Sequence, residues 1–224
     1  MASNDATNEA QLSGEAQVLG DARVSPFFDQ IIRNLNKPLL DVTAIFGAQV
    51  GRFVHAIGPQ RFFNWGVFRK AVNSYQGESL SGDIYKQTPI QSKKRSVASI
   101  AAEIADIIRA GHEDALSSTL ISNRLEATFT NLKSGKATDW LDFKDGSGRT
   151  SWEYRLLLAI PEGDAEDKFR AFVTTIKLEA DLDEASWLNL VNDSTHNFSA
   201  TIDVLNIVVL KSFSDKNPLQ RSAE

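Results

Sequence analysis

The residues best suited to catalysis or metal binding are scattered along this chain. Its histidines are His55, His112 and His196, and none lies in an HExxH frame or at another metal-ligand spacing. Ser147 stands between two glycines in "DGSGR", but the full G-x-S-x-G frame of a nucleophile elbow is absent, so the segment predicts a turn. The sequence therefore predicts no catalytic site, no metal and no cofactor.

The acidic segment "EGDAED", residues 162–167, has carboxylates at the wrong spacing for a calcium loop, which needs a central glycine and a distal glutamate. We expect a solvated turn there. The chain contains no cysteine, which excludes disulfides, thiol catalysis, thiolate metal sites and cysteine acylation.

One tight basic cluster, Lys93, Lys94 and Arg95, lies directly before a helix that Ser96 could cap. Cations at a helix N-terminus oppose its dipole, so local helix stability does not explain them. They could bind anionic lipid headgroups or sulphated glycans, or they could be a solvated loop that proteases cut. Cations of the predicted strands, Arg155 and Arg170 among them, could extend the patch.

Length and charge narrow the class of protein. A chain of 224 residues can form one sizeable domain, and a net charge of -5 argues against nucleic acid as the main partner. The first 23 residues lack the basic start and apolar core of a secretory signal and predict a disordered leader. No segment has the ~18 uncharged apolar residues of a membrane-spanning helix.

The first half of the chain predicts mainly helices. "VSPFFDQIIRNL" predicts a helix capped by Ser25, residues 39–75 predict several short helices, and residues 76–92 predict a loop with one short strand around Ile84. Two amphipathic helices follow, over 97–110 and 115–132. The face that these two helices turn toward a sheet is expected to carry Ile100, Ile104, Ile107, Ile108, Leu116 and Leu120.

From about residue 139 the apolar period changes to two, which indicates strands. "DWLDF", "SWEYRLLLAIP", "FRAFVTTIKLEA", a shorter "ASWLNLVN" and a last strand over 197–213 predict an α+β fold with a mainly antiparallel sheet. The last strand alternates as far as Val204 and is apolar on both faces after Leu205. Either helices cover both faces, or the strand enters a membrane, since ~9 to 11 residues suffice for a tilted strand to cross.

Several of these segments are similar to those of a known family. The run "LSSTLISNRLEATFTNLKSGKATDWLDF", then "SWEYRLLLAIPEGD" and "FVTTIKLEADLDEASWLNLVNDSTHNFSATIDVLNI", resembles the C-terminal half of the Cyt family of cytolytic delta-endotoxins, including its fungal volvatoxin-like members. The shared features are the "TFTNL" helix end, a tryptophan-bearing strand after it, a long strand ending in "AI", and a polar turn into the final strand.

The resemblance implies a single three-layer domain over residues 24–214, in which a long-stranded, mostly antiparallel sheet is wrapped by helical hairpins. Residues 24–135 would be mainly helical and residues 139–213 mainly strands. The leader, residues 1–23, and a flexible tail, residues 215–224, could be trimmed by proteases. Cyt-type proteins are not enzymes, so no catalytic residue is implied.

The resemblance also implies a function. Such proteins are soluble when produced, bind membrane phospholipids directly, form oligomers on the membrane and permeabilise target cells from outside once their helices leave the sheet. The apolar strand residues expected to enter lipid are Phe172, Ile176, Leu178, Phe198, Ile202, Val204, Val208 and Leu210. The alternative is a non-lytic protein that carries a lipid or another apolar ligand between its sheet and helices.

Overall fold

The computed structural model describes residues 26–58, 60–113, 115–135, 141–146 and 149–220. Its helices are α1 (Lys37–Gly51), α2 (Trp65–Asn73), α3 (Val97–Arg109), α4 (Ser118–Phe129), α5 (Leu132–Gly135) and α6 (Glu184–Trp187). Its strands are β1 (Asp29–Ile32), β2 (Val54–Ile57), β3 (Gln60–Phe63), β4 (Leu80–Ser96), β5 (Leu141–Gly146), β6 (Arg149–Pro161), β7 (Lys168–Ala180) and β8 (Thr195–Leu210). The predicted leader and Ser147 lie outside the described residues.

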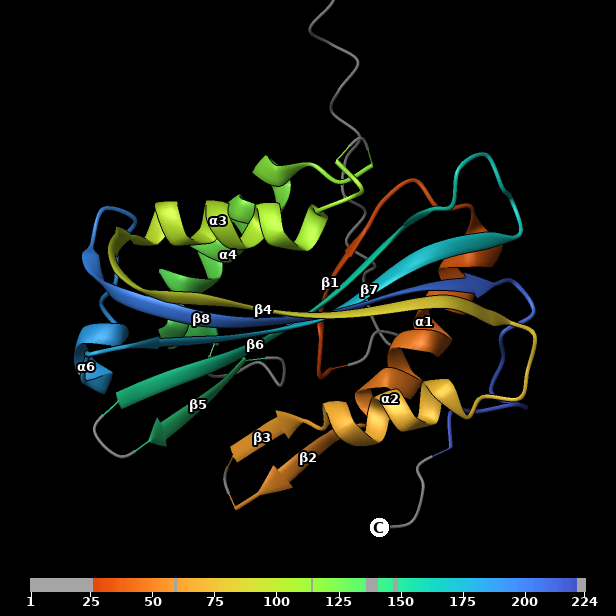
Figure 1. Ribbon diagram of the computed structural model, residues 1–224, viewed down its shortest axis with the longest axis horizontal. Coiled ribbons are helices and arrows are strands. Elements are labelled where there is room, and N and C mark those ends of the chain that lie inside the picture. Colours follow the sequence, from red (N-terminus) through yellow and green to blue (C-terminus); the bar gives the residue numbers. More distant parts are fainter. Residues whose placement is uncertain (1–25, 59, 114, 136–140, 147–148, 221–224) are drawn as a thin grey trace, which may run out of the picture.

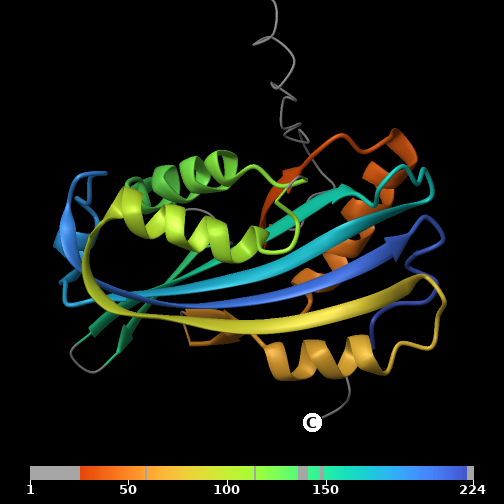
Figure 2. The ribbon, with the colours of Figure 1, turned by 45° about the horizontal axis from the view of Figure 1, so that its top comes forward.

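One sheet forms the middle layer, with the strand order β1-β6-β7-β8-β4 and with β5 also paired to β6. Its pairings are antiparallel except that of β1 with β6, which is parallel. Helices α3 and α4 lie over one face, whereas α1, α2 and the β2–β3 hairpin lie over the other (Figures 1 and 2). The fold is thus α+β with three layers, as the sequence predicts.

The elements with the clearest periodicity form where they are expected. Both amphipathic helices are present as α3 and α4, and four of the five strands expected after residue 139 are present as β5 to β8. Ser96 caps α3, because its Oγ accepts a hydrogen bond of 3.2 Å from the Ser99 N–H. Within the described residues, no helix is long and apolar enough to cross a membrane.

The helix expected at the start of the domain is a strand instead. Residues Asp29–Ile32 pair in parallel with Leu156–Ala159 of β6. Ile31 packs on the side of α3 and α4, whereas Phe28 and Ile32 pack on the side of α1 and α2. The apolar residues of this segment therefore point to opposite sides of the sheet, whereas the apolar stripe of a helix would place them all on one side.

The loop expected over residues 76–92 is also wrong, because β4 pairs with β8 along most of its length, with two bulges. An edge strand bonds to one neighbour only, and most of the β4 side chains are exposed. The apolar alternation that identifies a half-buried strand is therefore missing. As a result residues 24–135, expected to be mainly helical, contain four strands.

Two further expectations fail near the C-terminus. The first three residues of "ASWLNLVN" belong to the short helix α6 and the others are irregular, so no strand forms there. Asp183 caps α6 by accepting a 2.7 Å hydrogen bond from the Ser186 N–H. The tail expected to be flexible from residue 215 is held as far as Leu219, which is buried and donates its N–H to Gln49 Oε1 at 2.8 Å.

The apolar interior is divided into two parts by the sheet. We call the part under α3 and α4 the α3–α4 core and the part under α1 and α2 the α1–α2 core. Strand β8 serves both, because Phe198, Ile202 and Val204 belong to the first and Leu205 and Ile207 to the second. The apolar side of β8 therefore changes at Leu205, which explains why its alternation stops there.

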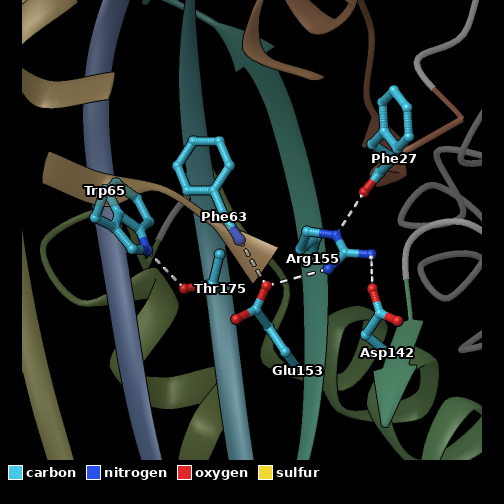
Figure 3. A network of polar contacts seen from close by, with 7 residues as sticks. All are labelled: Phe27, Phe63, Trp65, Asp142, Glu153, Arg155 and Thr175. Carbon is cyan, nitrogen blue, oxygen red and sulfur yellow. Dashed lines mark hydrogen bonds and ion pairs between the residues drawn. The ribbon is translucent and has the colours of Figure 1, made fainter. Parts of the chain in front are cut away.

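A buried ion network lies on the α1–α2 side of the sheet (Figure 3). Arg155 is fully buried, and its guanidinium donates to Glu153 Oε1 at 3.1 Å, to Asp142 Oδ2 at 3.2 Å and to the Phe27 carbonyl at 3.0 Å. One cation thus compensates two carboxylates and fixes the segment before β1.

The same network fastens the β2–β3 hairpin and the start of α2. Glu153 Oε1 also accepts a 2.9 Å hydrogen bond from the Phe63 N–H at the end of β3 (Figure 3). Trp65, the first residue of α2, donates its indole N–H to Thr175 Oγ1 of β7 at 2.7 Å. Hydrogen bonds therefore hold this part of the sheet to its cover, in addition to the apolar packing of Phe63 and Trp65 in the α1–α2 core.

Replacing Arg155 with Met should destabilise the protein by about 3–5 kcal/mol, because Glu153 and Asp142 would then keep buried carboxylates without their cation. Urea unfolding followed by tryptophan fluorescence measures the change. The double variant Glu153→Gln/Arg155→Met should recover part of the loss, since one unpaired charge is removed with its partner. If the Arg155→Met variant were as stable as the wild type, this account of the network would be contradicted.

Candidate functional site

The sheet face under α3 and α4 collects most of the strand residues that the sequence singles out. Six of them belong to the α3–α4 core and are buried on one face of β7 and β8. These residues are Phe172, Ile176, Leu178, Phe198, Ile202 and Val204.

The other two strand residues lie apart from that core. Val208 pairs with Arg170 of β7, and Leu210 is partly exposed at the end of β8. Both lie beyond the region that α3 and α4 cover, and neither belongs to the α3–α4 core or the α1–α2 core. The predicted set therefore contains one compact apolar face and two residues outside it.

The helix residues expected to cover this face do so. Ile100, Ile104, Ile108 and Leu116 are buried in the α3–α4 core, and Ile107 and Leu120 are partly buried against it. Because this contact is apolar, its stabilisation is about 25 cal/mol for each Å2 removed from water and has no directional requirement. Another apolar partner could replace this apolar part of the contact at little net cost.

Polar contacts fix the position of α4 on the sheet. Arg124 donates to both oxygens of Asp29 on β1 at 2.5 Å, and the Tyr154 hydroxyl of β6 donates to Asp29 Oδ2 at 2.5 Å. The hydrogen bonds to Asp29 raise the pKa of Arg124. Burial, followed by the Asp29 charge, raises the pKa of Tyr154. Asp29 is itself buried, so α4 is tied to two strands through one carboxylate.

The turn between α3 and α4 is fixed by a second polar chain. Asn206 Oδ1 of β8 accepts from Arg170 Nη1 at 2.8 Å, so its Nδ2 faces His112 Nε2 at 3.2 Å and His112 is the acceptor. Arg170 also donates twice to Glu162, and these hydrogen bonds lower the pKa of Glu162. The acidic turn 162–167 is therefore not wholly solvated, since Glu162 is bound to the sheet.

The sequence indicates these contacts only in part. Asn206 is a polar interruption in an apolar run, and such a residue in a buried strand needs a partner. Nothing in the local pattern pairs Asp29 with Arg124, which lies 95 residues further along the chain.

The basic cluster lies at the end of the edge strand β4 rather than in a loop. Lys93 and Lys94 are exposed, and no ion pair involves either of them in the part of the chain that the structure describes. Arg95 is committed to α3, since its Nη2 lies 3.2 Å from Glu103 Oε2 and its Nη1 donates to Ser99. Nearby, Lys86 and Arg95 line an open, mixed-charge groove of about 530 Å3 beside α3.

Arg155 and Arg170 do not extend this patch. Arg155 is fully buried in its ion network, and Arg170 is paired with Glu162. Among the described residues, no three histidine or carboxylate side chains are grouped so that they could hold a metal ion. His55 packs against the Phe62 ring and His196 against the Phe198 ring.

Comparison with known proteins finds solved structures of similar fold. No family model matches the sequence, and no curated protein matches it. A solved structure of a delta-endotoxin has a TM-score of 0.74 to this chain at 13% identity, over 96% of this chain and 93% of that one. The activated Cyt2Ba monomer from Bacillus thuringiensis subsp. israelensis has a TM-score of 0.66 at 17% identity, over 82% of this chain and 98% of that one.

Both likenesses extend over the helical layers as well as the sheet, since they cover most of each chain. Neither of these two structures is named as a fungal volvatoxin-like protein, so that part of the sequence resemblance stays an expectation. The three-layer arrangement agrees with both structural likenesses. This chain therefore has the fold of the Cyt delta-endotoxins.

Proposed function

We propose that this protein is a cytolysin that binds phospholipid bilayers directly, assembles with further copies on the membrane and permeabilises it. The observation that carries the proposal is the apolar sheet face under α3 and α4, which is continuous over β6, β7 and β8. The likeness to the Cyt delta-endotoxin fold supports the same function. No catalytic step is part of it.

The layers differ in how easily lipid could replace them. The α3–α4 pair covers the sheet mainly through apolar side chains, whose burial lipid can supply equally well. The α1–α2 layer adjoins the Arg155 network, where removal of the cover would leave charged groups that only water could solvate. We therefore propose that α3 and α4 leave the sheet and that this face meets the acyl chains.

Backbone pairing sets a further requirement. Strands in lipid must keep every N–H and C=O group bonded, because no water is present to replace a lost partner. Strands β6, β7 and β8 already pair with one another over 12 or 13 residues each, so they can move together without breaking these bonds. Pairing of the outer strands between copies would complete the requirement.

The protein should release dye from protein-free phospholipid vesicles at micromolar concentration, with or without limited proteolysis of its ends, and should form larger assemblies on them. The alternative, a carrier of an apolar ligand, predicts lipid that co-purifies with the protein and no dye release. The α3–α4 core is occupied by packed side chains, so the structure offers no particular support for a carrier. Intact vesicles under all these conditions would remove the proposed function.

Tryptophan quenching can identify which face meets lipid. Trp152 lies in the α3–α4 core, whereas Trp65 lies on the opposite side of the sheet. A variant that keeps only Trp152 should lose fluorescence on vesicles with brominated acyl chains, because that face would contact the chains. The matched variant that keeps only Trp65 should be quenched far less.

In each of these two variants the other three tryptophans are replaced by Phe, and circular dichroism checks that both are folded. Equal quenching of the two variants, or stronger quenching of Trp65, would show that the wrong face has been assigned to lipid.

The exposed lysines of β4 should contribute to the first contact with anionic lipid. The variant Lys93→Ser/Lys94→Ser should bind phosphatidylserine vesicles about 2 kcal/mol more weakly, roughly 25-fold, because each lysine near an anionic surface contributes about 1 kcal/mol. Co-sedimentation at low and high salt measures this. The control Lys37→Ser/Lys70→Ser removes two exposed lysines of the α1–α2 layer and should change binding little.

If Lys93 and Lys94 instead bind sulphated glycans, the first variant should lose retention on an immobilised sulphated glycan and keep its vesicle affinity. That result would transfer the role of the cluster from lipid to glycan.

A further inference from the structure

The turn between α3 and α4 holds a half-buried histidine against the sheet. The His112 ring stands edge-on to Phe172 of β7, with ring centroids 5.0 Å apart, and its Nε2 is 3.2 Å from Asn206 Nδ2 of β8. Phe172 and Asn206 are paired across the two strands, so both side chains point to the α3–α4 side. The His112 carbonyl accepts from the N–H groups of Ala115 and Leu116. The position of this residue is therefore coupled to the segment that leads into α4.

The hydrogen bonds require the ring to be neutral. Asn206 Oδ1 accepts a 2.8 Å hydrogen bond from Arg170 Nη1, so the amide cannot turn over without losing that bond, and its Nδ2 is the donor to His112. His112 Nε2 must then carry no proton, and the one proton of the neutral ring is on Nδ1. Nδ1 is buried and has no hydrogen-bond partner among the residues that the structure describes.

A second proton on this ring would break the contact with the sheet. It would bind at Nε2, where a donor would then face the Asn206 amide, itself a donor, across 3.2 Å. The Arg170 cation is bonded to the other end of the same amide and adds a like charge. The closed position therefore accommodates only the neutral ring, whereas a ring released into water can take up the proton.

Two carboxylates near His112 favour its protonated form. Hydrogen bonds from Arg170 lower the pKa of Glu162, and the charge of a protonated His112 lowers it further. The Gly111 N–H lowers the pKa of Glu113, with a smaller effect of His112. Glu162 already binds Arg170 through both oxygens, and Glu113 is exposed, so a protonated ring that turns toward Glu113 leaves the sheet.

The other neighbouring elements offer a protonated ring no acceptor in place of Asn206. Arg109 of α3 forms an ion pair with Asp106 at 3.0 Å, and Lys168 of β7 is a further cation near Glu162. On β4, Ile84 pairs with Asn206 and carries no charge.

We infer that His112 is an acid-sensitive release for the α3–α4 layer, in which protonation of its ring frees the turn from β7 and β8 and favours departure of both helices. The inference rests on the permeabilising function proposed above. Histidine side chains take up a proton between about pH 5 and pH 8. Since the open form binds one proton more than the closed form, a fall in pH favours opening, by at most about tenfold for each pH unit. The protein should thus permeabilise faster in mildly acidic surroundings.

The first test compares rates of dye release at about pH 5.5 and about pH 7.5 from phosphatidylcholine vesicles, whose headgroups keep the same charge over this range. The wild type should release dye roughly tenfold faster at the lower pH. His112→Gln offers Asn206 an acceptor that takes up no proton, so its two rates should be nearly equal. The matched controls His55→Gln and His196→Gln remove the other two histidines of the chain and should keep the wild-type ratio.

A change at the partner residue tests the same contact from the sheet side. Asn206→Asp supplies a carboxylate that can accept from Arg170 and from a protonated His112 together. The protonated ring would then be held on the sheet, so acid should no longer accelerate dye release by this variant. Circular dichroism at both pH values checks that each variant is folded.

Hydrogen exchange in solution, without lipid, gives a readout that does not depend on permeabilisation. At about pH 5.5 the backbone amides of the turn between α3 and α4 should exchange roughly fivefold faster or more in the wild type than in His112→Gln, because only the wild type gains the proton. At about pH 7.5 the two proteins should agree. Comparison at one pH removes the intrinsic effect of pH on exchange.

Equal exchange in the two proteins at the lower pH, or a wild-type rate ratio in His112→Gln, would overturn the role of His112 and leave the permeabilising function standing. A wild type that releases no dye at either pH would overturn the permeabilising function, and the exchange rates would still decide whether acid frees the turn.

Discussion

Long strands with apolar side chains on both faces need a cover on both faces, and most of this architecture follows from that need. Strands β6, β7 and β8 have 13, 13 and 16 residues, and β8 moves its apolar side chains from one face to the other at Leu205. One helical layer therefore covers one face near the start of β8, and the second layer covers the opposite face near its end. The three-layer fold is the physical solution for such strands in water.

The two covers are held in different ways, and the difference bears on function. Apolar burial stabilises the α3–α4 layer without requiring one geometry, whereas a few polar contacts, such as the Arg124–Asp29 pair, select the closed position. The Arg155 network attaches the β2–β3 hairpin through charged groups that require water once they are uncovered. A bilayer can replace the first cover but not the second, which is the physical basis for proposing that the face under α3 and α4 is the one that meets lipid.

Sequence periodicity predicts those helices and strands that keep the same buried face along their whole length. The period of two in β6 and β7 and the stripes of α3 and α4 are of this kind. Strand β4 could not be predicted because its side chains face solvent at a sheet edge, and β1 because its four residues divide their side chains between two cores. The Asp29 contact with Arg124 depends on the packing of α4 on β1, which a local pattern does not contain.

The central claim, that α3 and α4 leave the sheet when the protein meets a membrane, can be measured as a distance. The absence of native cysteine allows spin labels at Asn123→Cys on α4 and Asn73→Cys on α2, two exposed positions on opposite sides of the sheet (Figure 1). Pulsed electron paramagnetic resonance should show a longer and broader distance distribution on phospholipid vesicles than in solution. The same distribution on vesicles that are being permeabilised would contradict the account.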